Sequence, residues 1–233
     1  MTKHLLGSMA VCLCLVTQAL AGPPTESLKT KVNEARTLLK QKAKPGTPEA
    51  KKIDEQLRGV VEPVLDFKRM SENALRAHWS TLTDPNKAEF VSLFRSLLFR
   101  SYLNRIRKAN EDYTLQYEGE DAKGRKAAAV TVIAQTSKAE IELVFHVLTT
   151  DGKTWITEDV VIDEVSLVQN YREQFTRIIK KDGYPVLLQK MADKLIELGG
   201  TVPPEVKSVK VPAKAEAKPA AAGKSPTQAP TKK

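Results

Sequence analysis

The spacing of apolar residues changes twice along the chain, from a helical period to an alternating one and back. After Asp84-Pro85, apolar residues recur every three or four positions, at Phe90, Phe94, Leu97, Leu98 and Tyr102. This spacing places them on one face of a long helix. Similar spacing after Thr25 and after Thr47-Pro48 predicts two earlier helices, and residues 64–75 are typical of short helical turns.

The middle of the chain alternates with a period of two. Residues 114–121, 125–135, 138–150 and 153–163 are predicted strands, and the connections between them are short enough for hairpins. In the third strand, Ile141, Leu143, Phe145 and Val147 share one face, while Val144 lies on the other. Four strands joined in this way form an antiparallel meander.

A helical period returns after the last strand. Ser166 is the expected N-cap, and Gln169 three residues later completes a capping box. Asp182-Gly183 ends this helix, and Pro185 begins a final helix that stops at Gly199-Gly200. The pattern predicts an α+β domain in which several helices pack with a four-stranded antiparallel sheet. The concave side of such a sheet can hold a ligand.

The N-terminal segment has the features of a secretory signal peptide. Lys3 precedes an apolar run of about twelve residues, which is shorter than the roughly twenty that span a bilayer. Ala19-Leu20-Ala21 fits a cleavage site, so residues 1–21 are predicted to be removed. A retained membrane anchor is the alternative. Cys12 and Cys14 both lie in this segment, so the mature chain is expected to have no thiol.

The C-terminal residues 203–233 are rich in Ala, Lys and Pro and contain no aromatic residue. Such a composition buries too little apolar surface to offset the entropy of ordering, so we expect a disordered tail. The tail carries +5 of the net charge of +9. It either solvates the protein or contacts anionic membrane or cell-wall polymer. Residues 22–202 remain as one domain.

Catalytic motifs are absent from the sequence: it has no G-x-S-x-G, no P-loop and no G-x-G-x-x-G. His146 falls in a strand and has no second histidine at ligand spacing, so a structural role is the simpler interpretation. Alternation places Glu158 and Asp159 on opposite faces, and likewise Asp163 and Glu164. These carboxylates therefore favour a solvated strand edge over a cation site.

The plentiful apolar side chains leave two interpretations open. They form an ordinary core, or they surround a pocket for a hydrophobic ligand.

Three segments resemble the MlaC family of periplasmic phospholipid-binding proteins of the lipid-asymmetry (Mla) pathway, also called toluene-tolerance proteins. The segments are VEPVLDFKRMSENALRAHW, FVSLFRSLLFRSYLNRI and DVVIDEVSLVQNYREQF. The sequence departs from the family pattern where Leu75-Arg76 replaces Leu-Gly and where Glu164 replaces a late glycine. From Glu164 we expect that the turn before Ser166 does not need a positive φ.

The resemblance implies a carrier whose sheet and helices enclose an apolar cavity for acyl chains, with bound phospholipid as cargo and no other cofactor, no metal and no catalytic residue. It implies a periplasmic location and two membrane partners. These are an inner-membrane ABC transporter complex with a periplasmic ring and an outer-membrane lipoprotein–porin complex. Membrane contact would be transient, and no nucleic acid is expected.

The candidate lipid-binding residues are apolar and come from the predicted helices and strands. They are Phe67, Met70, Trp79, Phe90, Phe94, Leu97, Leu98, Tyr102, Val130, Val132, Ile141, Leu143, Phe145, Val147, Val160, Ile162, Leu167, Tyr171, Phe175 and Ile178. Arg172 is the candidate for the headgroup rim, where it would either pair with phosphate or contact solvent.

Two other functions stay open. An isomerase-like enzyme with a cone-shaped α+β pocket would use Glu158, Asp159 or Tyr171. A cell-wall or membrane-associated adaptor would use the basic tail.

Overall fold

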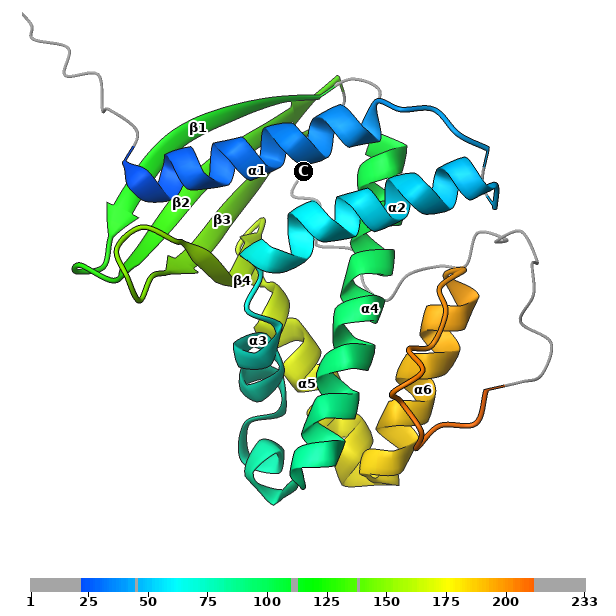
Figure 1. Cartoon of the computed structure of the whole chain (residues 1–233). Helices are drawn as coiled ribbons and strands as arrows, with labels where there is room; N and C mark the ends of the chain where they lie inside the picture. Colours follow the sequence, from blue (N-terminus) through cyan, green and yellow to red (C-terminus); the bar gives the residue numbers. More distant parts are fainter. Residues whose placement is uncertain (1–21, 45, 110–112, 138, 212–233) are drawn as a thin grey trace, which may run out of the picture.

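The computed structural model describes residues 22–211 except 45, 110–112 and 138 (Figure 1). The predicted signal peptide and residues 212–233 lie outside the described residues. The helices are α1 (Pro23–Leu39), α2 (Pro48–Val61), α3 (Phe67–Leu75), α4 (Asp84–Ala109), α5 (Leu167–Asp182) and α6 (Tyr184–Glu197), with 3₁₀ turns η1 (Glu62–Val64) and η2 (Arg76–Thr81). The strands are β1 (Tyr113–Ala122), β2 (Ala127–Thr136), β3 (Glu140–Leu148), β4 (Ile156–Ile162) and β5 (Val165–Ser166).

Local signals in the sequence account for several helix starts. The Thr47 hydroxyl accepts a hydrogen bond from the backbone N–H of Ala50 (3.3 Å), and Pro48 occupies the first turn of α2. The Ser166 hydroxyl likewise accepts from the N–H of Gln169 (3.0 Å), which confirms the predicted cap of α5. The side chain of Gln169 donates to Glu173 instead of completing a capping box.

The sheet is antiparallel and has the strand order β1-β2-β3-β4-β5. The α+β architecture is confirmed, but the sheet has five strands and not the four we predicted. The fifth strand is the two-residue β5, which pairs with the end of β4.

The turn between β4 and β5 corrects a second prediction. Asp163 and Glu164 have φ of 46° and 67°, and Ile162 pairs with Val165 across them. Both residues therefore lie in a two-residue hairpin turn that needs positive φ, not on opposite faces of a strand. Arg76 also has a positive φ, of 50°. Among the described residues, Asp163, Glu164 and Arg76 thus hold a positive φ without being glycine, and our expectation that the turn at Glu164 does not need one is wrong.

The pairing register sorts the strand residues onto two faces. Val130 pairs with Phe145, which pairs with Val160, and Val132 pairs with Leu143, which pairs with Ile162. These residues share one face, here called the inner face, and Ile141 and Val147 join them as predicted. Helix α1 packs on the inner face, because Leu28 and Val32 cluster with Val130, Val132 and Val147. Figure 1 shows α1 running across β1 and β2.

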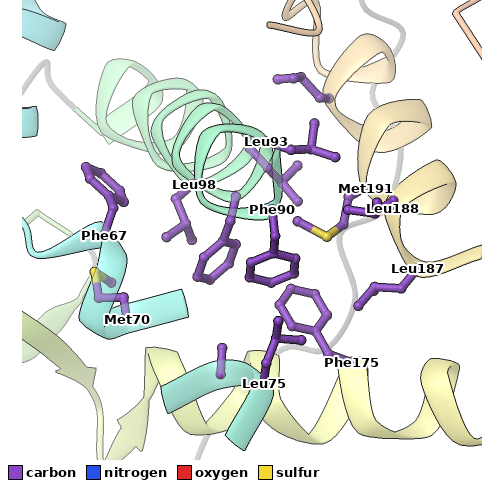
Figure 2. Packing of buried hydrophobic residues seen from close by; sticks show 14 of the residues in the cluster. Phe67, Met70, Leu75, Phe90, Leu93, Leu98, Phe175, Leu187, Leu188 and Met191 are labelled. Carbon is purple, nitrogen blue, oxygen red and sulfur yellow. The ribbon is translucent and has the colours of Figure 1, made fainter. Parts of the chain in front are cut away.

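A second apolar cluster, the helical core, lies between α3, α4, α5 and α6 (Figure 2). Phe90 and Phe94 of α4 are fully buried there. Their ring centroids lie 5.6 Å and 5.5 Å from that of Phe175 of α5, in edge-on arrangements that aromatic rings favour.

Helix α2 is attached to α4 by a third, smaller cluster. Ile53 and Leu57 of α2 pack with Phe99 and Leu103 of α4. Arg100 donates to Asp54 (3.0 Å) and to the carbonyl oxygens of Leu198 and Gly199, which joins α2 to the end of α6. The α1–α2 hairpin is therefore held firmly at its α2 end.

Residues 201–211 form a C-terminal strap along α4 and α6 (Figure 1, orange). Val206 is only 6% exposed, and Val202 and Val209 also pack against the helical core. Ser92 donates a hydrogen bond to Glu205, and Glu89 accepts from the N–H of Lys207 (3.0 Å). Our prediction of disorder is therefore wrong for residues 203–211.

Candidate functional site

The inner face of the sheet is an apolar surface that is only partly covered. Where α1 lies over it, Val130, Val132 and Val147 are at most 3% exposed. Away from α1, the inner-face residues of β3 and β4 are only partly buried. These residues are Ile141, Leu143, Phe145, Val160 and Ile162. Continuous aliphatic surface across strands is suited to an aliphatic ligand.

Polar contacts, not backbone pairing, hold α1 along the edge strand β1. Thr25 donates to Glu120 Oε2 twice, through its backbone N–H (3.1 Å) and its hydroxyl (2.6 Å). Further along, Arg36 donates to the carbonyl oxygen of Tyr113 (3.3 Å), and its guanidinium lies 4.9 Å from the Tyr113 ring centroid. Side-chain contacts of this kind separate more readily than the backbone ladder between paired strands.

Between these two contacts, Lys29 Nζ lies 5.1 Å from the centroid of the Tyr117 ring. The Tyr117 ring packs in the sheet cluster. Burial raises the pKa of the Tyr117 hydroxyl above its ordinary value, with a smaller opposing effect from the Arg36 charge. The hydroxyl is therefore protonated at neutral pH and available as a donor.

A polar concavity of about 260 Å³ lies on the other side of β3 and β4, against α3 and α5. It is lined by Asn73, His146, Glu158, Asp159, Val168 and Arg172. Both carboxylates line it because β4 shifts register here: His146 pairs with Asp159 but Val147 pairs with Thr157, which leaves Glu158 as an extra residue. The prediction that Glu158 and Asp159 lie on opposite faces is therefore wrong.

A larger concavity of about 480 Å³ lies where η1 and the start of α3 meet α4. It is lined by Glu62, Pro63, Leu65, Asp66, Phe67, Lys68, Val91, Arg95 and Ile156. Arg95 bridges part of it, with Nη1 3.7 Å from Glu62 and its guanidinium 5.7 Å from the Phe67 ring centroid. Only Phe67 among the candidate lipid-binding residues lines this concavity.

Comparison with known proteins identifies the family. The family model described as "MlaC protein" matches residues 29–193, which is well over half of the chain. The chain belongs to the MlaC family.

A solved structure similar to this MlaC-family chain is the phospholipid-binding protein from Ralstonia solanacearum in complex with a phospholipid. It is 22% identical, with a TM-score of 0.65, and the match covers 76% of this chain and 98% of that one. At this identity the likeness shows a shared fold. A search of curated proteins finds no significant match. In the part of the chain that the structure describes, no helix has the length and apolarity needed to span a bilayer.

The structure divides the sequence-predicted lipid residues of this MlaC-family protein between two places. Twelve belong to the helical core: Phe67, Met70, Trp79, Phe90, Phe94, Leu97, Leu98, Tyr102, Leu167, Tyr171, Phe175 and Ile178. Eight lie on the inner face of the sheet: Val130, Val132, Ile141, Leu143, Phe145, Val147, Val160 and Ile162. Eight of the twelve residues in the first group are buried, whereas only three of the eight in the second group are buried and the other five are partly exposed.

The residues suggested for an isomerase-like site make structural contacts within the protein. Asp159 accepts hydrogen bonds from the Ser166 hydroxyl and from the N–H groups of Val160 and Val168, and so ties β4 to the start of α5. The Tyr171 ring centroid lies 5.1 Å from that of Phe94, inside the helical core. Arg69 pairs with Glu158 (3.3 Å). The polar concavity that holds both carboxylates is not lined by Tyr171.

Arg172 occupies the same polar concavity. Its Nε donates to the carbonyl oxygen of Asn73 (2.8 Å), which fixes α5 against the end of α3. This places Arg172 beside His146, on the face of the sheet opposite to Leu143 and Phe145. The structure does not bring Arg172 to the inner face, so the rim of an inner-face site must use other cations.

Sequence analysis missed the residues that join α1 to β1. The first helix was expected to begin after Thr25, yet Thr25 is buried within α1, whose N-cap is Gly22, and its hydroxyl donates a hydrogen bond to Glu120, 95 positions away. One signal was available: Tyr113, Leu115 and Tyr117 alternate along the first strand, which places two aromatic rings on one face.

Proposed function

We propose that this protein binds a phospholipid by burying its acyl chains against the inner face of the sheet, beneath α1, and carries it through the periplasm. One observation carries the proposal: several strands contribute to an aliphatic surface that is covered by α1, and side-chain hydrogen bonds tie this helix to β1. Membership of the MlaC family supports it, as does the similar fold of a protein solved with bound phospholipid.

Transfer energetics explain why such a carrier needs this surface. At about 0.8 kcal/mol per buried CH₂, two chains of about sixteen carbons represent roughly 25 kcal/mol of hydrophobic free energy. A phospholipid therefore does not cross water unaided at a useful rate. The carrier must bury the chains about as well as the bilayer does, so that loading and release are nearly balanced. Such binding depends on a large apolar area more than on specific polar contacts. Because no covalent bond is broken during transport, no catalytic residue is needed.

Entry of the chains requires α1 to move. The two concavities described above measure about 260 and 480 Å³, whereas pockets for drug-sized ligands measure about 300–1,000 Å³, and neither concavity is lined by residues of the inner face. Separating α1 from β1 and β2 would expose Leu28 and Val32 together with the buried valines of the inner face. The acyl chains would then replace these contacts with equivalent apolar contacts, so the opened state is stabilised by its cargo.

The family resemblance extends the proposal to partners. The carrier would exchange lipid with an outer-membrane lipoprotein–porin complex and with an inner-membrane ABC transporter complex. Because binding is nearly balanced, direction would come from those complexes and not from the carrier itself. The predicted signal peptide agrees with export to the periplasm.

Native mass spectrometry of the purified mature chain tests the proposal. We expect a phospholipid adduct, or uptake of one from vesicles. Leu143→Asp places a charge on the inner face and should abolish the adduct, because a carboxylate is costly to bury beside acyl chains. The matched control is Val144→Asp, one position along β3 but on the opposite face, which should retain lipid. Loss of lipid in both variants, or in neither, would falsify the placement, and absence of any adduct in the unaltered chain refutes lipid binding.

A further inference from the structure

Within the apolar cluster of the inner face, two buried side-chain donors find no hydrogen-bond partner among the described residues. They are the hydroxyl of Tyr117 and the indole N–H of Trp155. A buried donor without a partner is costly, so native proteins rarely retain one without a reason. In an apolar site, such a donor indicates where a polar atom of a ligand would lie.

The two donors come from positions that are well separated along the strands of the sheet. Their positions can be compared along β2. Tyr117 pairs with Val132 of β2. Trp155 precedes Ile156, which pairs with Leu148 of β3, and Leu148 pairs with Ala127 of β2. Five residues along a strand correspond to roughly 17 Å. We therefore treat them as two alternative partners for the polar part of a phospholipid.

Positive charge distinguishes the Tyr117 end. Lys29 lies over the Tyr117 ring, and Arg36 lies about two turns further along α1, over Tyr113. Lys29 is also paired with Glu26 (2.9 Å), but this carboxylate is 60% exposed, so the pair is weak and can exchange partners. From the sheet interior outward, the order is thus aliphatic surface, hydroxyl donor and cations. A phospholipid has the same order: acyl chains, ester carbonyls and phosphate.

We propose that Tyr117 is the residue that positions the cargo, by donating a hydrogen bond to an acyl ester carbonyl, with the phosphate emerging between α1 and β1 beside Lys29 and Arg36. This inference rests on the proposed lipid binding. The ester is assigned to Tyr117 because the hydroxyl is enclosed in the apolar cluster, where the neutral carbonyl attached to the chains is far cheaper to desolvate than the charged phosphate.

The experiment offers the full mature chain vesicles that contain equal amounts of two phosphatidylglycerols. One carries two hexadecanoyl ester chains and the other carries two hexadecyl ether chains, which lack carbonyls, and native mass spectrometry separates the adducts. We expect the unaltered protein to prefer the diester by about fivefold, as one neutral hydrogen bond allows. Tyr117→Phe should bind both equally while its lipid-free thermal stability is unchanged or higher, because an unpaired buried hydroxyl has been removed.

Tyr184→Phe is the matched control. It also removes one tyrosine hydroxyl, but this hydroxyl donates to the carbonyl oxygen of Asn86 (3.1 Å) in the helical part of the protein. It should lower thermal stability and keep the preference for the diester. If Tyr117 had a purely structural role, Tyr117→Phe would also lower thermal stability and keep the preference for the diester. The comparison of the two variants therefore separates a structural role of Tyr117 from a role in ligand binding.

The remaining outcomes overturn the inference in distinguishable ways. Equal binding of both lipids by the unaltered protein refutes the ester contact but leaves lipid binding intact. Loss of the preference in Trp155→Phe, but not in Tyr117→Phe, moves the polar end of the site to Trp155. A parallel competition offers the ester phosphatidylglycerol and the matching diacylglycerol, which lacks the phosphate. If Tyr117→Phe loses a preference for phosphatidylglycerol in that competition, the hydroxyl binds phosphate and not the ester. Failure of the unaltered chain to take up either lipid refutes the proposed function itself.

Discussion

Weakening the contact between α1 and β1 should accelerate lipid exchange. Glu120→Ala removes the acceptor of both hydrogen bonds from Thr25. A hydrogen bond to a charged group contributes about 1.5–3 kcal/mol when buried, and the partial exposure of Glu120 lowers this to about 1 kcal/mol each. Loss of both is therefore worth about 2 kcal/mol, and the population with α1 open should rise about 30-fold.

The assay follows transfer of a fluorescent phospholipid from vesicles to the protein. If α1 opens and closes rapidly before lipid enters, the transfer rate scales with the open population. Glu120→Ala should then be up to about 30-fold faster, and Glu120→Gln, which keeps an acceptor without its charge, should lie between this variant and the unaltered protein. Glu205→Ala is the control, because it removes a carboxylate that accepts from a hydroxyl far from the sheet.

Joining the same two positions should have the opposite effect. The mature chain is expected to lack cysteine, so Thr25→Cys with Glu120→Cys can be bridged selectively by a short thiol-reactive linker. The rate of lipid transfer should fall when the two cysteines are bridged. It should recover when a cleavable linker is used and is then cleaved. Unchanged transfer rates in both Glu120→Ala and the bridged protein would show that lipid enters without movement of α1, and the reasoning above would be wrong.

Four other predictions concern stability. The Ser92 hydrogen bond lowers the pKa of Glu205, so the ionised Glu205 stabilises the fold at neutral pH. Glu205→Gln should therefore unfold at a lower temperature than the unaltered protein at pH 7. This difference should disappear as the pH falls below the ordinary value of 4.5 and through the lowered pKa. Removing residues 212–233 should leave the melting temperature and lipid binding unchanged, whereas removing 203–233 should lower stability because the strap is lost. Arg76→Gly should raise the free energy of unfolding in denaturant titrations by about 1 kcal/mol, since glycine tolerates the positive φ. Phe94→Asp should leave the chain unfolded by circular dichroism, because it buries a charge in the helical core.

Much of the local structure followed from the sequence because it depends on local chemistry. Helical spacing from Phe90 to Tyr102 determined α4, and alternation along β3 placed Leu143 and Phe145 on one face, since the helix and the strand each have a fixed period. The cap at Ser166 needs only the N–H of Gln169 three residues later. The family could also be inferred, because its motifs are contiguous stretches of sequence.

Other features depend on partners that are remote in the chain, so no local pattern could reveal them. Val206 is ordered because the helical core offers it an apolar surface, although its neighbours have the composition of a disordered tail. Glu158 joins Asp159 in one concavity because of a register shift against β3. Glu164 adopts a positive φ because β5 must turn back on β4, and the pairing of the two strands over-determines the strained turn.

The sequence by itself therefore determined the elements, their apolar faces and the family. Only the tertiary structure decided which apolar residues bury one another in a packed core and which stay partly exposed on the inner face of the sheet. The aromatic residues of α4 and α5 looked equally suited to either role, and they pack together because four helices converge on them. The inner face remains partly open because one helix, held by Thr25 and Glu120, is too narrow to cover the width of the sheet.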